Sequence, residues 1–441
     1  MQQPQGARAQ QEPRARPGTP SLLRELNDRA ALDLLLRGEM LTRSQISEYT
    51  GVSRVTVAQM LARLEERGLV AIVGEQAGNR GPNAALYSVV PSSAYVAGLY
   101  IEADLVSAAV ADVTGRRVAD VSVNPNSAED PVEVVLGVVE RACARAGVDV
   151  AALRALVIGS PGVVDPRTGD PRLAVNLPAW HEGALDALRG VLHTPVVIEN
   201  DVNLAAMAER AAGAAAGADD FVLVWLGGGL GLATILGGQL HRGTAGAAGE
   251  IGYLPVHGAP LPSDIRHPAS GGLQWLAGGS GVRALAESYG FTAPTAAEAV
   301  RAAVAHARTA QAEGQAGAPA QDAPEPGAPA QDAAEPGGSR AGGSRPASSP
   351  FLDDLAHRVA VGVASVCVVL DPGLVVLGGE VGRAGGDALA SRVAAEVAGI
   401  CPARPRVVPT GVPDEPVLRG AMLAAVGLAR AALLASVADP Q

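Results

Sequence analysis

Apolar residues recur at helical spacing near the start of the chain. Between Ser21 and Gly38 they are Leu22, Leu23, Leu26, Ala30, Leu34 and Leu35. This spacing predicts one helix with a single buried face. A polar stretch at 42–47 and a second apolar repeat at 54–67 predict two shorter helices. The first part of the chain is therefore expected to form a helical module.

The two shorter helices are joined by a tight turn, Thr50-Gly51-Val52, because glycine tolerates a positive φ that strains other residues. Ser53 is expected to cap the second helix and Gly68 to end it. Two short helices joined by a glycine turn form a helix-turn-helix. The side chains of the second helix that are expected to face inwards are Val55, Met60, Leu61 and Leu64.

Two apolar runs follow this module, at 69–73 and 85–89, on either side of the loop 78–83. They predict a hairpin of strands similar to the wing of a winged helix. The first residues of a recognition helix meet base edges in the major groove. We therefore expect Arg54 to contact guanine, Thr56 a phosphate or a base, and Val57 a thymine methyl. The full set of predicted DNA contacts is Arg43, Ser44, Ser53, Arg54, Thr56, Val57 and Arg80. The alternative is a helical module that binds another protein.

From Tyr95 the pattern changes to short β-rich runs that alternate with alanine-rich helices. Alternation of this kind predicts stacked α/β layers. The uncharged stretch from Phe221 to Leu240 is long enough to raise the question of a membrane span. It contains six glycines, however, and so predicts two buried strands around a glycine turn.

Two segments are too polar and too rich in proline to bury a core. Residues 1–20 predict a disordered tail. Residues 310–350 contain GAPAQDAPEP followed at once by GAPAQDAAEP, and predict a disordered insertion, with a proline-rich docking site as the alternative. The predicted domains are therefore a winged helix over 21–90 and an α/β body over 94–441 that the insertion interrupts.

The charge balance excludes several classes of protein. The chain has 441 residues, with 34 basic side chains that are all arginine, 45 acidic side chains and a net charge of −11. Without lysine there can be no GxxxxGK[ST] phosphate loop and no Schiff-base lysine. The first 90 residues hold eleven arginines against nine acidic residues, so their net charge is +2 and the remainder carries −13. An acidic body argues against a protein that coats nucleic acid or anionic lipid over its whole surface.

The cysteines and the N-terminal segment indicate the cellular compartment in which the protein is expected. Cys143, Cys367 and Cys401 are far apart and have no CxxC spacing, which predicts neither a disulfide framework nor a cysteine-based zinc site. The first twenty residues lack the apolar core of a signal peptide. These features predict a cytoplasmic protein with no membrane partner.

Six motifs occur in order along the α/β region. They are Ile158–Asp165 (IGSPGVVD), Asn176–Trp180 (NLPAW), Val197–Ala206 (VIENDVNLAA), Gly227–Gly231 (GGGLG), Gly243–Gly252 (GTAGAAGEIG) and Asp371–Gly379 (DPGLVVLGG). Together with the helix-turn-helix in 21–70, they resemble the ROK family of repressors, open reading frames and sugar kinases. The resemblance implies an actin-like, ribonuclease-H-like sugar-kinase fold of two α/β lobes, preceded by a winged helix-turn-helix.

The resemblance also implies the residues of a sugar site. Asp201 stands at the position of the family's catalytic base, at a predicted strand-to-helix junction that projects a side chain into a cleft. Taken alone, Asp201 could equally be the N-cap of the helix 202–212. The other ligand-binding positions that the resemblance implies are Gly162, Asn176, Asn200, Glu250 and Gln274. Gln274 replaces a glutamate and can still form hydrogen bonds.

The phosphate loops depart from the family's pattern. Where its kinases have a DIGGT-like loop, this chain has Glu102 and Ala103 in place of both glycines and Asp104 in place of the hydroxyl residue. Two carboxylates repel a phosphate by about 1 kcal/mol or more per close pair at partly solvated distances. The other nucleotide-loop positions are Gly227, Gly228, which replaces a threonine, Gly229, Gly378 and Gly379.

Many members of this family hold zinc through a histidine after GEIG and a CxCGxxGC run. The aligned residues here are Tyr253, Ile265, His267 and Gly272. One histidine does not make a zinc site, which usually has four ligands. We therefore expect no metal and no cofactor, and we expect His257 and His267 to be surface histidines.

These features predict a ROK-type transcriptional regulator, specifically a repressor of sugar-metabolism genes. It would bind a palindromic operator in double-stranded DNA as a homodimer or homotetramer, and close on a sugar or sugar-phosphate effector without kinase activity. One alternative is an active ATP-dependent sugar kinase with a DNA-binding appendage, because Asp201 is retained. Another is a constitutive DNA binder with a vestigial pocket.

Overall fold

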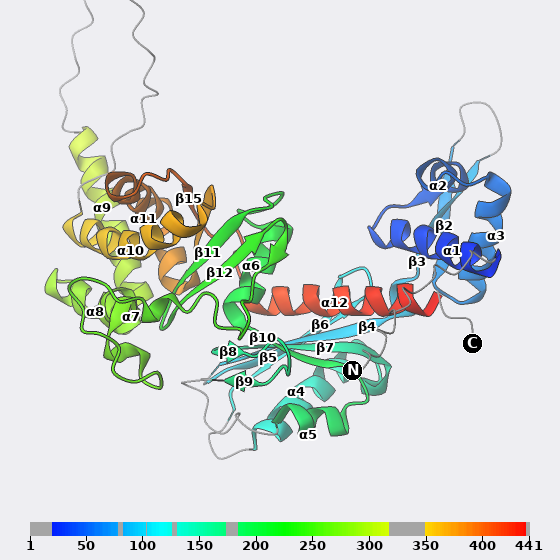
Figure 1. Cartoon of the computed structure of the whole chain (residues 1–441), viewed down its shortest axis with the longest axis horizontal. Coiled ribbons are helices and arrows are strands. Elements are labelled where there is room, and N and C mark those ends of the chain that lie inside the picture. Colours follow the sequence, from blue (N-terminus) through cyan, green and yellow to red (C-terminus); the bar gives the residue numbers. More distant parts are fainter. Residues whose placement is uncertain are drawn as a thin grey trace, which may run out of the picture.

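The computed structural model describes residues 20–77, 83–102, 104–125, 130–172, 184–316 and 349–437. Most of the predicted tail and most of the predicted insertion lie outside the described residues, as do Arg80, Ala103 and Asn176, and Pro20 of the predicted tail begins the first helix. Figure 1 shows three bodies, with a winged helix at one end of the molecule and two α/β lobes beyond it.

The N-terminal module is a winged helix, as predicted. Its elements are α1 (Pro20–Leu36), β1 (Leu41–Thr42), α2 (Arg43–Thr50), α3 (Arg54–Glu66), β2 (Val70–Gln76) and β3 (Ala84–Val89). Gly51 and Gly68 have φ values of 71° and 67°, so both predicted glycine positions are in the left-handed region. β3 pairs antiparallel with β2 and also with β1, a short strand that the sequence pattern does not predict.

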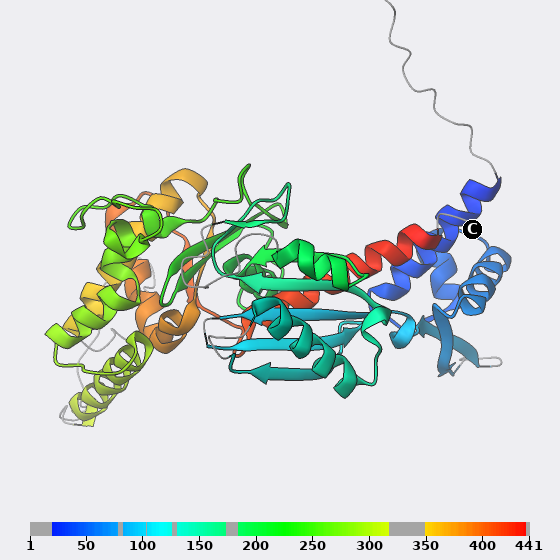
Figure 2. The same cartoon turned by 90° about the horizontal axis from the view of Figure 1, so that it is seen from below.

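The predicted buried face of α1 is wrong up to Ala30, which is exposed although its spacing places it on that face. Leu22, Leu23 and Leu26 are exposed, and Figure 2 shows the first turns of α1 projecting beyond the module. Packing begins at Asp28, which accepts a hydrogen bond of 2.7 Å from Arg63 Nε of α3. The apolar residues of α1 that are buried beyond this point are Ala31, Leu32, Leu35 and Leu36.

Two five-stranded sheets form the body. The first contains β4 (Tyr95–Ile101), β5 (Val106–Asp112), β6 (Arg117–Val123), β7 (Leu153–Ser160) and β10 (Val196–Asn200). The second contains β11 (Phe221–Leu226), β12 (Leu230–Leu236), β13 (Gln239–Leu240), β14 (Leu374–Gly378) and β15 (Arg406–Pro409). A small hairpin, β8 (Val163–Val164) and β9 (Pro171–Arg172), lies beside the first.

The two sheets have the same topology. Their strand orders are β10-β7-β4-β5-β6 and β13-β12-β11-β14-β15. In each sheet three consecutive strands form an antiparallel meander, a fourth strand pairs in parallel with the first strand of that meander, and a fifth pairs in parallel with the fourth. This duplicated order agrees with the two-lobed α/β body that the family resemblance implies.

Helices pack on the sheets and on one another. They are α4 (Pro131–Ala146), α5 (Ala184–Val191), α6 (Asp201–Ala212), α7 (Gly272–Ala277), α8 (Gly279–Ser288), α9 (Ala296–Ala316), α10 (Pro350–Leu370), α11 (Gly379–Ile400) and α12 (Pro416–Val437). α6 packs between the two sheets. α9 continues to Ala316, so the predicted insertion boundary at 310 is wrong, because this alanine-rich stretch still favours helix.

α12 is a long apolar helix that runs from the lobes to the winged helix (Figure 1, Figure 2). By length and composition alone it could cross a bilayer. Half of its 22 residues are buried inside the protein, against β4, β7 and α6. These contacts account for its apolar composition.

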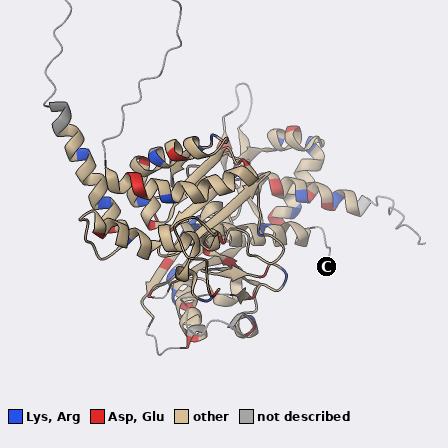
Figure 3. Cartoon of the chain, turned by 60° about the vertical axis from the view of Figure 1, so that its left-hand side comes forward, with Lys and Arg blue, Asp and Glu red and all other residues tan. Residues whose placement is uncertain are grey.

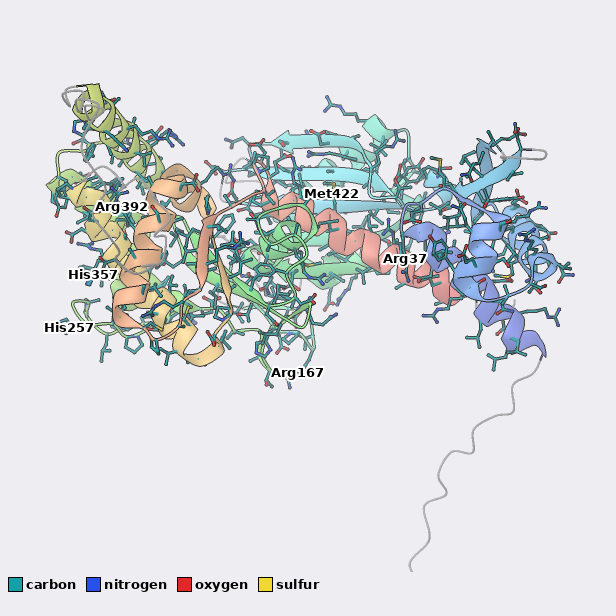
Figure 4. All side chains as sticks on the ribbon, turned by 90° about the horizontal axis from the view of Figure 1, so that it is seen from above. Arg37, Arg167, His257, His357, Arg392 and Met422 are labelled. Atoms are coloured by element: carbon teal, nitrogen blue, oxygen red, sulfur yellow. The ribbon has the colours of Figure 1, made fainter. Side chains whose placement is uncertain are left out.

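Two glycines set how closely α12 packs. Gly420 lies against the backbone carbonyl of Leu204 on α6, where a Cβ would overlap that carbonyl. A Cβ on Gly98 of β4 would lie 2.8 Å from the backbone nitrogen of Met422, and Figure 4 labels Met422 at this crossing. At both positions the absence of a side chain permits backbone contact between neighbouring elements.

The far end of α12 holds the winged helix. Arg67, which follows α3, donates from Nη2 to the backbone carbonyl of Ser436 at 3.0 Å. Leu433 shares one buried core with Leu32 of α1. Arg430 Nε donates to the carbonyl of Val113, between β5 and β6, at 2.9 Å. The winged helix is therefore packed onto α12 as well as joined to the body by the chain.

Replacing Gly420 by alanine tests the contact between α12 and α6. We expect Gly420→Ala to lower the free energy of unfolding by about 1–3 kcal/mol, because the added Cβ overlaps the Leu204 carbonyl. Gly427→Ala is the matched control, since Gly427 is exposed on the same helix and its Cβ position has nothing within 4 Å. That control should stabilise the protein by about 0.5–1 kcal/mol. Denaturant unfolding measures both, and equal effects at the two positions would contradict the contact.

Candidate functional site

The first turn of α3 presents a short polar edge to solvent, which we call the recognition edge (residues 53–56). Ser53 caps the helix, since its Oγ accepts a hydrogen bond of 3.2 Å from the Thr56 backbone nitrogen. The two hydroxyl oxygens of Ser53 and Thr56 lie 2.9 Å apart. Arg54 and Val55 follow the cap on the exposed surface. The edge thus offers donor, acceptor and apolar groups, which are the groups that read base edges in a major groove.

The structure corrects which valine belongs to this edge. From the sequence we expect Val57 on DNA and Val55 in the core, and the structure reverses both. Val57 is 0 % exposed, whereas Val55 is 70 % exposed. The reason is that the buried stripe of α3 runs through Val57, Met60, Leu61 and Leu64, spaced three or four residues apart. Val55 is therefore the candidate for contact with a thymine methyl.

The other predicted DNA contacts have different surroundings. Ser44 is exposed in the first turn of α2. Arg43 donates from Nε to the hydroxyl of buried Tyr87 at 2.9 Å, and its guanidinium lies 5.4 Å from the centre of that ring. This contact ties α2 to β3, so Arg43 positions the helix-turn-helix on the wing sheet. Its contact with DNA stays a prediction.

A cleft of about 470 Å³ lies between the two lobes. Residues from both lobes line it, among them Gly162, Asn200, Asp201, Gly228, Gly229, Glu250, Tyr253, Arg266, His267 and Gln274. The structure thus brings together every predicted ligand-binding residue that it describes. A cleft of this size with a few polar groups is typical of a site for a small molecule.

Asp201 lies where β10 passes into α6, as predicted. The cap of α6 is Asn200, whose Oδ1 accepts a hydrogen bond of 3.0 Å from the Asn203 backbone nitrogen. Asp201 accepts one from the Val202 backbone nitrogen at 2.8 Å. The alternative that Asp201 itself is the N-cap is therefore wrong, and the carboxylate belongs to the wall of the cleft.

A buried glutamate braces this junction. Glu199 Oε1 accepts hydrogen bonds from the Asn200 backbone nitrogen at 3.0 Å and from Asn203 Nδ2 at 2.9 Å. Its Oε2 accepts one from Arg242 Nε of the other lobe at 2.7 Å. Asn200 Nδ2 donates to the Gly162 carbonyl at 3.0 Å. The sequence pattern does not single out Glu199, although a charge at the end of an otherwise apolar strand is a signal for a buried partner.

The surroundings of Asp201 change its titration. Burial raises the pKa of Asp201 to about 7, and the nearby carboxylates of Glu250 and Glu102 act in the same direction. Burial also raises the pKa of Glu250. A carboxyl group with a pKa near neutrality exists in both forms, so Asp201 can donate or accept a hydrogen bond to a ligand oxygen.

Carboxylates gather at the first phosphate-loop position. The Tyr100 hydroxyl donates to Glu102 Oε1 at 2.7 Å, in the hairpin between β4 and β5. Burial raises the pKa of Glu102; the Tyr100 hydrogen bond opposes that rise, and Glu380 and Asp104 add to it. The negative groups are therefore close enough to influence one another, and a phosphate placed there would add to the repulsion.

Glu380 is a candidate that the sequence pattern does not single out. It stands in the first turn of α11, directly after Gly378 and Gly379, and its carboxylate lies against Gly227. The start of a helix offers amide donors that phosphate groups bind. In this chain the carboxylate of Glu380 occupies the first turn of α11, where a phosphate would otherwise bind. The sequence signal that could have identified Glu380 is an acidic residue directly after a glycine pair at the start of a helix.

Gln274 braces the second glycine loop. Its Nε2 donates to the Gly228 carbonyl at 3.0 Å, and its Oε1 accepts from the Leu230 backbone nitrogen at 2.8 Å. Both ends of this buried amide are thus bonded to the turn between β11 and β12. A contact between Gln274 and a sugar stays a prediction.

Hydrogen bonds close the loop at which the resemblance places zinc. The Tyr253 hydroxyl donates to the Ile265 carbonyl at 2.5 Å, and His267 Nδ1 lies 2.9 Å from Asp264 Oδ2. Within the described residues, no group of three or more His, Cys, Asp or Glu side chains is placed to hold a metal ion. The three cysteines are buried and free. The residues at these positions do not fit a zinc ion, and His267 lines the cleft beside Arg266.

Comparison with protein families divides the chain at the same place as the fold. The profile of the ROK family matches residues 96–426, and that of the MarR family matches residues 26–81. The xylose repressor of Caldicellulosiruptor bescii is 25 % identical over 244 residues, which are 54 % of this chain and 61 % of that protein. The matched part thus spans about three fifths of that relative's length.

Two solved structures share the fold. A ROK family transcriptional regulator, described as a homologue of the E. coli MLC protein, has a TM-score of 0.69 at 15 % identity and covers 95 % of this chain and 100 % of its own. The ROK hexokinase of Thermus thermophilus has a TM-score of 0.55 at 26 % identity and covers 75 % of this chain and 97 % of its own. They confirm a winged helix followed by a sugar-kinase-like α/β body.

The free energy of unfolding is expected to fall as pH rises from about 4 to about 7. Asp201 has a pKa of about 7 in the folded protein and an ordinary value of 3.8, so in this range the folded state holds a proton that the unfolded chain releases. Asp201→Asn should remove part of this decline and be the more stable protein at pH 7.5, by about 1–3 kcal/mol.

Urea unfolding at about pH 5 and about pH 7.5 measures this effect. Asp414→Asn, at an exposed position, is the control and should follow the parent protein. A decline in Asp201→Asn as large as that of the parent would show that Asp201 does not titrate in this range.

Proposed function

The chain belongs to the ROK family, and from this premise we propose that it is a sugar-responsive transcriptional repressor. The winged helix binds operator DNA, and the cleft between the lobes binds a sugar or sugar phosphate. The observation that carries the proposal is α12, because this one helix contacts both α6, which starts at the cleft, and the winged helix. The relative named xylose repressor makes D-xylose the first sugar to test.

The proposed coupling between the cleft and the winged helix begins at α6. Asn200 and Asp201 form the start of this helix, and Leu204, one turn later, contacts Gly420 of α12. A ligand that draws the lobes together moves α6. Because the two backbones are in contact, α12 follows, and with it the Arg67 hydrogen bond to the winged helix. A sugar changes DNA affinity only if it binds one arrangement of the lobes better than the other.

The DNA-binding part of this proposal rests on the recognition edge. Arg54 and Val55 are exposed at the start of α3, the part of a recognition helix that meets base edges. We infer a homodimer on a palindromic operator, with half-sites about one helical turn or a multiple apart. Such a regulator acts in the cytoplasm on bacterial DNA and needs no cofactor.

We infer that the cleft binds its sugar without phosphorylating it. Glu102, Asp104 and Glu380 place negative charge where a kinase of this fold would hold phosphate, at about 1 kcal/mol or more of repulsion per close pair. A second candidate function is sugar phosphorylation. It is favoured by Asp201, whose position and pKa of about 7 suit a general base.

Arg54 is expected to read sequence in the operator. Arg54→Ala should weaken binding to an operator obtained by selection from random DNA by about 1–3 kcal/mol and relax the preference at one base pair. Arg29→Ala is the matched control, because Arg29 is an exposed arginine of α1 in the same module. Fluorescence anisotropy measures both variants. Equal losses in the two variants would remove Arg54 from sequence readout.

Sugar titration tests the function of the cleft. D-xylose, followed by hexoses, amino sugars and sugar phosphates, should include one compound that lowers operator affinity by about tenfold. Asp201→Asn should weaken that response and leave operator binding without sugar unchanged. No response to any of these sugars would instead favour a constitutive DNA binder.

The same proteins are assayed for ADP release with ATP and each sugar. We expect no sugar-dependent turnover. Turnover that Asp201→Asn abolishes would identify a kinase and overturn the non-enzymatic part of the proposal.

A further inference from the structure

A second cavity, of about 330 Å³, lies between α9 and α11. Arg301 and Arg308 of α9 and Arg383 of α11 line it, and we call it the arginine cavity. Its other lining residues are small, namely Val304, Ala305, Ala384, Gly385 and Gly386. It shares no lining residue with the sugar cleft. It lies at the end of the molecule opposite the winged helix (Figure 1).

One face of α9 carries two of the three arginines. Arg301 and Arg308 are seven residues apart, about two helical turns, with Val304 and Ala305 between them on the same stripe. Figure 3 shows the positions of basic residues along this helix in blue. α11 supplies Arg383 from the opposite wall, so three guanidinium groups line one small space.

These arginines differ from most others in the structure. Arg63, Arg242 and Arg392 each form an ion pair with a carboxylate. Across the described ranges, none of the three arginines of the cavity forms an ion pair or hydrogen bond with another residue. In a chain with a net charge of −11, a cavity lined by three exposed arginines and no carboxylate favours anions.

A break in α11 adds to the lining. Gly386 has φ 50° and ψ −148°, which interrupts the helix at the edge of the cavity. The helix restarts after it, and the first amide groups of a helix segment lack partners within that segment. A Cβ on Gly386 would meet nothing within 4 Å, so the backbone is open at this point. Backbone donors and guanidinium groups together are the groups that hold phosphate.

We propose that the arginine cavity binds a small phosphate-bearing anion at a site separate from the sugar cleft. The planar guanidinium presents several donors that match phosphate oxygens. The volume suits a compact ligand rather than a folded partner. An operator bound at the winged helix of the same protomer is at the other end of the molecule (Figure 2), so its phosphates do not reach the cavity.

Calorimetric titration of the full chain with inorganic phosphate, pyrophosphate and glycerol 3-phosphate at constant ionic strength tests the proposal. We expect saturable binding of one anion per chain. The triple variant Arg301→Gln, Arg308→Gln, Arg383→Gln should lose at least about tenfold in affinity, because hydrogen bonds between charged groups supply most of the binding. Arg154→Gln is the matched control, at an exposed arginine of β7 in the other lobe, and should bind like the parent. Preference for glycerol 3-phosphate would identify a phosphorylated metabolite, and preference for inorganic phosphate would identify free phosphate.

Three results would overturn the proposal. The first is no saturable binding by the parent chain. The second is binding that the triple variant retains. The third concerns the four acidic residues of the tandem repeat, Asp322, Glu325, Asp332 and Glu335. If the full chain binds phosphate only after these four residues are changed to Asn and Gln, the acidic repeat competes with phosphate for the arginines. The parent chain then does not bind a phosphate-bearing anion in this cavity.

Discussion

The backbone contact between α6 and α12 is the constraint on which the rest of the structure depends. Gly420 and Leu204 approach so closely that no side chain fits between the helices. α6 packs between both sheets, and α12 continues into the core that Leu433 shares with Leu32 of the winged helix. Because a close-packed interior transmits strain, a displacement of α6 at the cleft reaches the winged helix through α12.

Charge is segregated within this body in a way that separates two kinds of ligand. In the cleft, burial raises the pKa of Asp201 and Glu102, and neighbouring carboxylates add to the effect. Such a surface suits neutral hydroxyl groups and disfavours phosphate at the loop positions. The arginine cavity has the opposite preference, and both sites include residues of the second lobe.

Much of this architecture could be predicted from local patterns. Gly51, Ser53 and Gly68 mark the helix-turn-helix because their roles depend on the backbone around them, and the junction at Asp201 follows from an apolar strand that runs into a helix. The exchange of Val55 and Val57 was open to prediction, because Val57 lies three and four residues before Met60 and Leu61 and therefore belongs to the same helical stripe. Glu380 and Arg242 are distant in sequence from the residues they contact, and only the tertiary fold brings them there.

The position of α12 near the end of the chain also determines the order in which parts of the protein can pack during synthesis. The winged helix, complete at β3, leaves the ribosome about three hundred residues before the helix against which it packs. The first sheet must likewise wait for α12 until the second lobe has been made. Contacts of such long sequence separation form late and slowly. A nascent chain therefore carries the winged-helix segment before α12 has been made, and the packed connection between the cleft and the winged helix forms only when translation is nearly finished.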